Sequence, residues 1–149
     1  MLNLGINMKA IALMLLLAPV QGLSESQAEE KCSKVKSAQI VRVDDRSKRV
    51  FVRIRPDQIS TKRKAGSVLL SLQEKITACY PHLGKEWSAS FFSDERYADY
   101  KTEFIDKPSS ISIADWSDHY IGEYERKKQR LTLYPMAPKL MKYFTIVLP

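Results

Sequence analysis

The sequence has few glycines and histidines and no signature of a common catalytic or metal site. Of its 149 residues, 5 are glycine and 2 are histidine. A phosphate-binding loop needs closely spaced glycines, which do not occur, and the GxSxG, CxxC and HExxH motifs are absent as well. We therefore expect neither a metal nor a cofactor, and no motif names a reaction.

A long apolar run is also missing. The main run, Ala10–Ala18, follows Lys9 and stops before Pro19. It covers about ten residues, whereas a membrane-spanning helix needs about 20. A short charged region, an apolar core and small residues are typical of a cleavable signal peptide. We predict a signal peptide over residues 1–22, with residue 28 as the alternative end. The mature chain is then exported, to a periplasmic or extracellular location, without a membrane span.

The remaining residues are enough for one domain. We predict a flexible, polar lead-in over residues 23–37 and a single domain over residues 38–149. The only cysteines are Cys32 and Cys79. In an oxidising compartment such a pair normally forms a disulfide, and two cysteines allow one intramolecular connectivity. The bond would tie the lead-in to the end of the main helix.

Hydrophobic periodicity predicts an α+β fold. Alternation in AQIVRVDDRSKRVFVRIRP indicates a hairpin, and helical spacing from Gly66 to Tyr80 indicates the main helix. Further strands are expected over Glu86–Ser93, Tyr120–Arg126, Arg130–Tyr134 and Tyr143–Leu148. The predicted fold is a mostly antiparallel sheet of about six strands packed on one main helix, with one or two short helical turns near residues 93 and 113.

Residues 118–126 fit two structures. As a helix they align Trp116, Tyr120 and Tyr124 in one stripe, and as a strand they turn Tyr120, Gly122 and Tyr124 to one face. Gly122 would weaken a helix interior by about 1 kcal/mol. This favours the strand, although the helix stays open.

Basic residues are concentrated in the first half of the mature chain. The whole sequence carries a formal charge of +7; residues 29–75 hold 13 basic and 6 acidic groups, whereas residues 76–149 hold 10 of each. Such asymmetry can mark an anionic partner. The candidate anion-binding residues are Arg53, Arg55, Lys62, Arg63 and Lys64. Because an exported protein meets little nucleic acid, the expected anion is an envelope or extracellular polymer or a lipid surface.

Tyrosine and arginine favour a protein partner, since these residues dominate interface energy. The candidate contact residues are Tyr97, Tyr100, Tyr120, Tyr124, Tyr134 and Arg126. The expected function is therefore binding of another macromolecule, with an exported protein as the expected partner, as an inhibitor or interaction module.

A hydrolase is the third alternative, although the sequence leans against an enzyme. His119 lies close in sequence to Asp115 and Asp118, and a histidine with a carboxylate can act as an acid and base.

Overall fold

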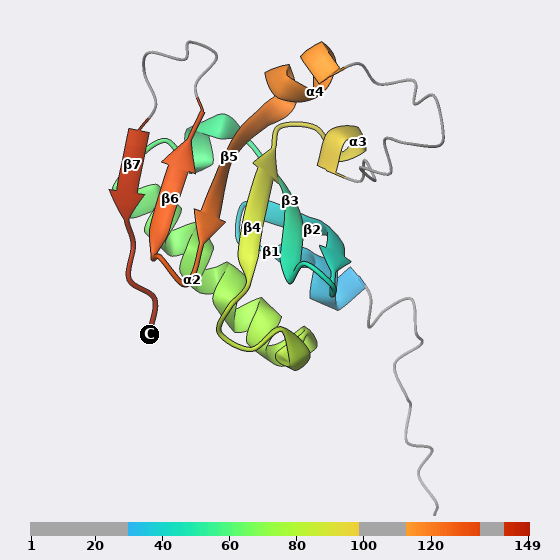
Figure 1. Cartoon of the computed structure of the whole chain (residues 1–149), viewed down its shortest axis with the longest axis vertical. Coiled ribbons are helices and arrows are strands. Elements are labelled where there is room, and N and C mark those ends of the chain that lie inside the picture. The colour runs from blue at the N-terminus through green and yellow to red at the C-terminus, as the bar shows by residue number, and fades with distance from the viewer. Residues whose placement is uncertain (1–29, 99–112, 135–141) are drawn as a thin grey trace, which may run out of the picture.

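Seven strands form one sheet in the computed structural model, which describes residues 30–98, 113–134 and 142–149. Their order in the sheet is their order in the sequence (Figure 1). The strands are β1 (Lys34–Val35), β2 (Ala38–Asp44), β3 (Arg49–Ile54), β4 (Ser88–Phe92), β5 (Tyr120–Glu125), β6 (Arg130–Leu133) and β7 (Lys142–Thr145). The α+β fold with a mostly antiparallel sheet is confirmed.

The strand pair β3–β4 is parallel, whereas the other neighbouring pairs are antiparallel. Parallel neighbours need a crossover, and here helix α2 (Lys62–Cys79) supplies it. Figure 1 shows α2 running behind the sheet, while the short helices α3 (Glu95–Ala98) and α4 (Ile113–His119) lie near the ends of β4 and β5. The main helix therefore covers one face of the sheet only.

Helix α2 builds the core with the strands. Its first turn is capped by the Thr61 hydroxyl, which accepts a hydrogen bond from the Lys64 amide at 3.3 Å. Pro81 follows the helix and opens a short 3-10 turn, η2 (Pro81–Leu83). The buried residues of α2 recur at helical spacing. They are Ala65, Val68, Leu69, Leu72 and Ile76. The observed helix begins four residues before the predicted start at Gly66, because Thr61 caps it.

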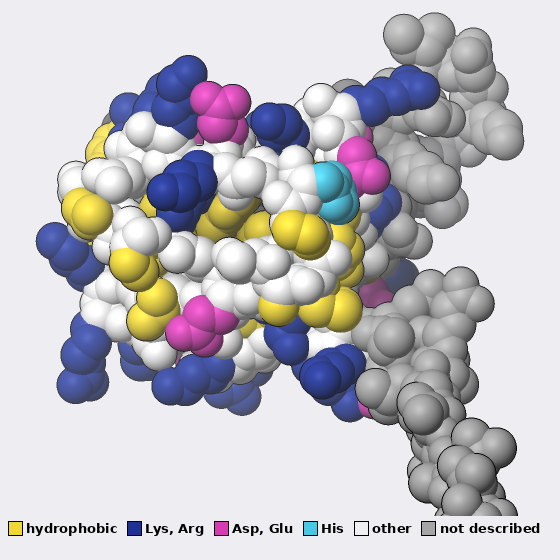
Figure 2. Space-filling view, turned by 90° about the horizontal axis from the view of Figure 1, so that it is seen from below, with side chains coloured by type: hydrophobic (Ala, Val, Ile, Leu, Met, Phe, Trp, Pro, Cys, Tyr) yellow, Lys and Arg dark blue, Asp and Glu magenta, His cyan; other side chains and the backbone are white. Residues whose placement is uncertain are grey.

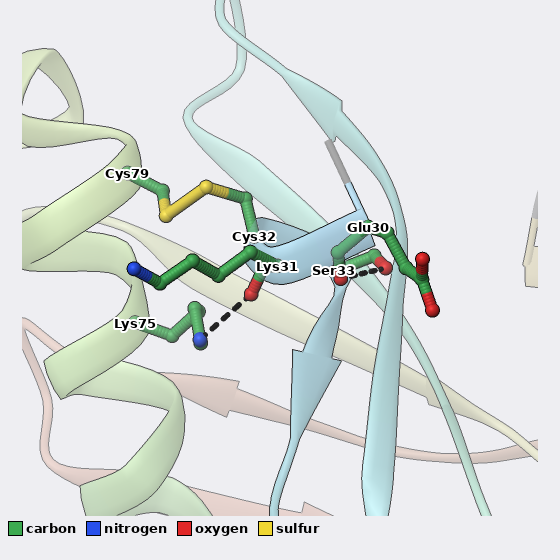
Figure 3. The surroundings of a disulfide bond; sticks show 6 residues. All are labelled: Glu30, Lys31, Cys32, Ser33, Lys75 and Cys79. Atoms are coloured by element: carbon green, nitrogen blue, oxygen red, sulfur yellow. Dashed lines mark hydrogen bonds between the residues drawn. A yellow bond between two sulfur atoms is a disulfide. The ribbon is translucent and has the colours of Figure 1, made fainter. Parts of the chain in front are cut away.

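A disulfide joins Cys32 to Cys79, as predicted, with the two Cα atoms 5.9 Å apart. Figure 3 shows the bond running from a helical turn at residues 30–33 to the end of α2, beside Lys75. The Lys75 ammonium donates to the Lys31 carbonyl at 2.8 Å. Residues 30–37, which were predicted as part of the flexible lead-in, thus contain this turn and the edge strand β1. This strand raises the number from the six predicted to the seven observed.

Both interpretations of residues 118–126 apply in part. Helix α4 ends at His119 and strand β5 begins at Tyr120. The register between β4 and β5 shifts where Phe91 pairs with Gly122 but Phe92 pairs with Tyr120. Ile121 is the extra residue of this bulge. The expectation that Tyr120 and Tyr124 share a face is therefore wrong, because a bulge reverses the alternation.

None of the helices in the described ranges combines the length and the apolar composition that crossing a bilayer requires. The predicted signal peptide, residues 1–22, lies outside the described residues, as does its alternative end at residue 28.

Candidate functional site: the second sheet face

The face of the sheet opposite α2, here called the second face, carries aromatic side chains. Strand alternation assigns Phe51 of β3, Phe92 of β4 and Tyr143 of β7 to this face, because their chain neighbours Val50, Phe91 and Phe144 pack in the core under α2. The bulge adds Tyr120, and Tyr134 follows β6 on the same side. Trp116 reaches the cluster from α4.

Ring contacts join Phe51, Phe92, Trp116, Tyr120 and Tyr134 into a continuous row. Phe51 and Phe92 stack with centroids 6.4 Å apart, and Phe92 lies 5.5 Å from Trp116 and 5.2 Å from Tyr120. Tyr120 stacks in turn on Trp116 at 4.9 Å and on Tyr134 at 5.4 Å. Phe92 is buried, whereas Tyr134 is 39% exposed. The row therefore has its buried ring, Phe92, in the interior, with half-buried Phe51 at one end and exposed Tyr134 at the other.

Glu123 supplies a polar centre next to the rings. Its carboxylate accepts a hydrogen bond from the Tyr120 hydroxyl at 3.3 Å and lies 4.0 Å from the Arg49 guanidinium. Arg49 also donates to the Ser90 hydroxyl at 3.2 Å. Burial, with the Glu123 and Tyr134 side chains beside it, raises the pKa of Tyr120 well above its usual value. The Tyr120 hydroxyl therefore stays protonated and can donate at neutral pH.

Charges at the β6 side of the second face are paired. Glu125 lies 2.6 Å from Lys128 and 3.4 Å from Arg130, and the hydrogen bond from Lys128 holds the pKa of the Glu125 carboxyl below its usual value. Arg130 also lies 5.7 Å from the ring of Tyr143, which is 52% exposed. Because acids and bases alternate here, this part of the face has no strong field of one sign.

Two of the predicted contact residues lie on the other side of the sheet. Tyr124 is fully buried, packs on Trp87 at 5.6 Å and donates its hydroxyl to the Ile146 carbonyl at 2.9 Å. Arg126 lies 5.8 Å from the Trp87 ring, contacts Gln73 and donates to the Pro149 carbonyl at 2.9 Å. Of the other predicted contact residues, Tyr120 and Tyr134 lie on the second face, Tyr97 stacks on His119, and Tyr100 lies outside the described residues.

The predicted anion-binding residues lie at the β3–α2 connection. Lys62, Arg63 and Lys64 are exposed in the first turn of α2, and Arg53 and Arg55 are exposed at the end of β3. Asp57 joins the two groups: its carboxylate lies 3.2 Å from Arg55, and its carbonyl accepts from Lys64 at 2.9 Å. Figure 2, which views the molecule from below, shows Lys and Arg side chains spread around that side with hydrophobic side chains between them.

His119 lies beside Ser93, the residue that follows β4. Its Nδ1 is 2.8 Å from the Ser93 hydroxyl, and the Tyr97 ring stacks on the imidazole with centroids 4.1 Å apart. Asp115 and Asp118 are exposed in α4. Ser93 and Tyr97 both contact the His119 ring, and neither was predicted as its partner. Ser93 lies 26 positions away, so no local pattern could reveal the pair.

Within the described residues, no group of three or more His, Cys, Asp or Glu side chains is arranged to hold a metal ion. No protein-family model, curated protein or solved structure matches this chain.

Proposed function

We propose that this chain is an exported, disulfide-stabilised interaction domain that binds another protein through the second face of its sheet. The observation that carries the proposal is the row of aromatic rings from Phe51 to Tyr134, on a face that the main helix leaves uncovered. Aromatic side chains give large contact area with little loss of conformational entropy.

The surroundings of the row support a protein partner over a polyanion. Arg49 faces Glu123, and Arg130 faces Glu125, so these arginines present hydrogen-bonding groups without a large excess of positive charge. A polyanion would need uncompensated cations, and its binding would fall steeply with salt. The disulfide and the predicted leader are in keeping with an exported location.

The test is capture of a partner from the protein's own exported compartment on the immobilised mature domain, eluted first with rising salt and then with denaturant. We expect one protein to remain bound through high salt. The double variant Tyr134→Ala/Tyr143→Ala should lose it, because both rings are exposed on the second face. Leu70→Ala is the matched control, since Leu70 is 40% exposed on α2.

Three results would contradict the proposal. Equal capture by the double variant would remove the second face from the interaction. Release of many acidic polymers at modest salt would favour the electrostatic alternative, with Arg63 and Lys64 as its residues. Capture of nothing by the wild-type domain would leave hydrolysis through His119 as the function to screen, with His119→Ala as control.

A further inference from the structure

Two adjoining hollows share one wall, which is formed by Arg53 and Ser93. The first, of about 540 Å³, lies between the start of β2 and the end of β3 and is lined also by Ser33, Ser37 and Gln39. The second, of about 610 Å³, is bounded by Arg53, Ser93, Asp94 and the first two residues of α3, Glu95 and Arg96. The shared wall thus lies between two spaces that together can hold a ligand of sugar size.

Arg53 differs from the other cations around these hollows. Lys34 is paired with Glu30, Arg55 lies 3.2 Å from Asp57, and Arg96 lies 3.0 Å from Asp94. Arg53 makes a hydrogen bond to the Gln39 side chain at 3.4 Å, and no carboxylate of the described residues pairs with it. Its guanidinium therefore keeps donors for a planar oxyanion such as a carboxylate or a phosphate.

Ser93 adds a hydroxyl whose direction depends on His119. The Ser93 oxygen and His119 Nδ1 are 2.8 Å apart, so one of them donates to the other. When Nδ1 carries the proton, it donates to Ser93, and the serine hydrogen, for which the His119 carbonyl is an acceptor at 3.5 Å, can turn to an oxyanion at the wall. The Tyr97 ring stacks on the imidazole and thereby fixes the plane of the His119 ring beside the Ser93 hydroxyl.

We propose that the wall formed by Arg53 and Ser93 binds the oxyanion of a small, hydroxyl-rich ligand, and that His119 positions the Ser93 hydroxyl as a donor. Short polar side chains at residues 33, 37 and 39 supply partners for ligand hydroxyls. This site is separate from the protein partner proposed above and does not depend on it.

The test is an NMR titration of the isotopically labelled mature domain with glucuronate, glucose 6-phosphate and uncharged glucose. We expect saturable shifts at the Ser93 amide, the Arg53 side chain and the His119 ring with one or both anions. Binding of glucuronate would indicate a carboxylate ligand, and binding of glucose 6-phosphate would indicate a phosphate ligand. The imidazole nitrogen shifts should move toward the form with the proton on Nδ1.

Single-residue variants test whether the anion binds at the shared wall or at the residues around it. Arg53→Gln should weaken anion binding by about tenfold or more, because it removes a charged donor. Arg55→Gln is the matched control: it lines the first hollow but already pairs with Asp57, and should change affinity by less than about twofold. Ser93→Ala should weaken binding and abolish the His119 response.

The inference is overturned if glucose gives the same shifts as the two anions, if neither anion shifts Ser93, or if Arg53→Gln titrates like the wild type. A protein partner that binds normally while both anions fail would reject this site and leave the proposed function intact.

Discussion

The two faces of the sheet are formed by the same strands but differ in composition and burial. Under α2, side chains such as Val50, Val52 and Leu69 are completely buried and make apolar contacts. On the second face, the rings of Phe92 and Tyr120 are followed by Glu123, Arg49 and the exposed Tyr143. One face holds the domain together, whereas the other combines aromatic area with charged and hydroxyl groups.

This difference separates residues that serve stability from residues that are available for binding. An apolar core needs no paired ions and no exposed rings. The second face has both, so its composition is not explained by packing alone. If the comparison is right, changes on the two faces should affect different measurements.

Truncation of the core should have the largest effect. Leu69→Ala removes a fully buried side chain and should lower the free energy of unfolding by about 2–5 kcal/mol. Tyr143→Ala, on the exposed second face, should change it by less than about 0.5 kcal/mol. Urea unfolding followed by circular dichroism measures both. Similar losses of unfolding free energy in Leu69→Ala and Tyr143→Ala would contradict the proposed difference between the two faces.

Removal of the disulfide should have the next largest effect. Cys32→Ser/Cys79→Ser opens a loop of 47 positions and should cost about 2–4 kcal/mol. The bond holds the helical turn at residues 30–33 to α2, so the lost stability comes from the side of the sheet that α2 covers. Thermal unfolding with and without reductant checks this result. A variant as stable as the oxidised protein would show that the N-terminal turn adds nothing to the core.

Gly122→Ala should be costly although it adds one methyl group. A Cβ at Gly122 would lie 2.3 Å from the Thr132 backbone oxygen, and backbone cannot move aside as a side chain does. We expect a loss of about 1–3 kcal/mol from this overpacking. Gly66→Ala is the matched control, since its Cβ would meet no atom within 4 Å. Equal unfolding free energies for the two variants would contradict the close approach of β5 and β6.

The smallest effect is expected from Tyr120 at alkaline pH. Burial beside Glu123 raises the pKa of Tyr120 in the folded state above the unfolded value of about 10. The unfolded chain then loses its proton first, so stability present below pH 10 declines as pH rises further. Tyr120→Phe should flatten this decline. Unfolding free energies of the variant and the wild type, measured from about pH 8 to 11, check this, and an equally steep decline in both would contradict it.

Local patterns in the sequence were sufficient for most elements of the fold. The β2–β3 hairpin, α2 and the β5–β6 hairpin follow from alternation, helical spacing and turn residues over short distances. The parallel pair β3–β4 was not predicted, because Arg49 and Ser88 meet only through the α2 crossover. The Ile121 bulge was missed as well, since a single extra residue leaves no compositional trace.

The candidate site was less predictable than the fold. Tyr120 could be named as a contact residue, but Tyr124 could not be recognised as buried, since both are tyrosines in one alternating segment. Arg53, Ser93 and His119 lie on or next to three different elements, β3, β4 and α4. Their proximity depends on contacts between these elements. Residue type identified candidates, and only the fold decided which of them are near one another.

The order of the strands has a consequence for how the chain assembles. The disulfide closes within residues 32–79, which contain β1, β2, β3 and α2 but none of the later strands. After β4 has docked on β3, strands β5, β6 and β7 each pair with the strand just before them. A chain that emerges from its N-terminus can therefore complete a cross-linked half first. The second half then adds strand by strand, and we expect the docking of β4 across the α2 crossover to be slower than the later, more local pairings.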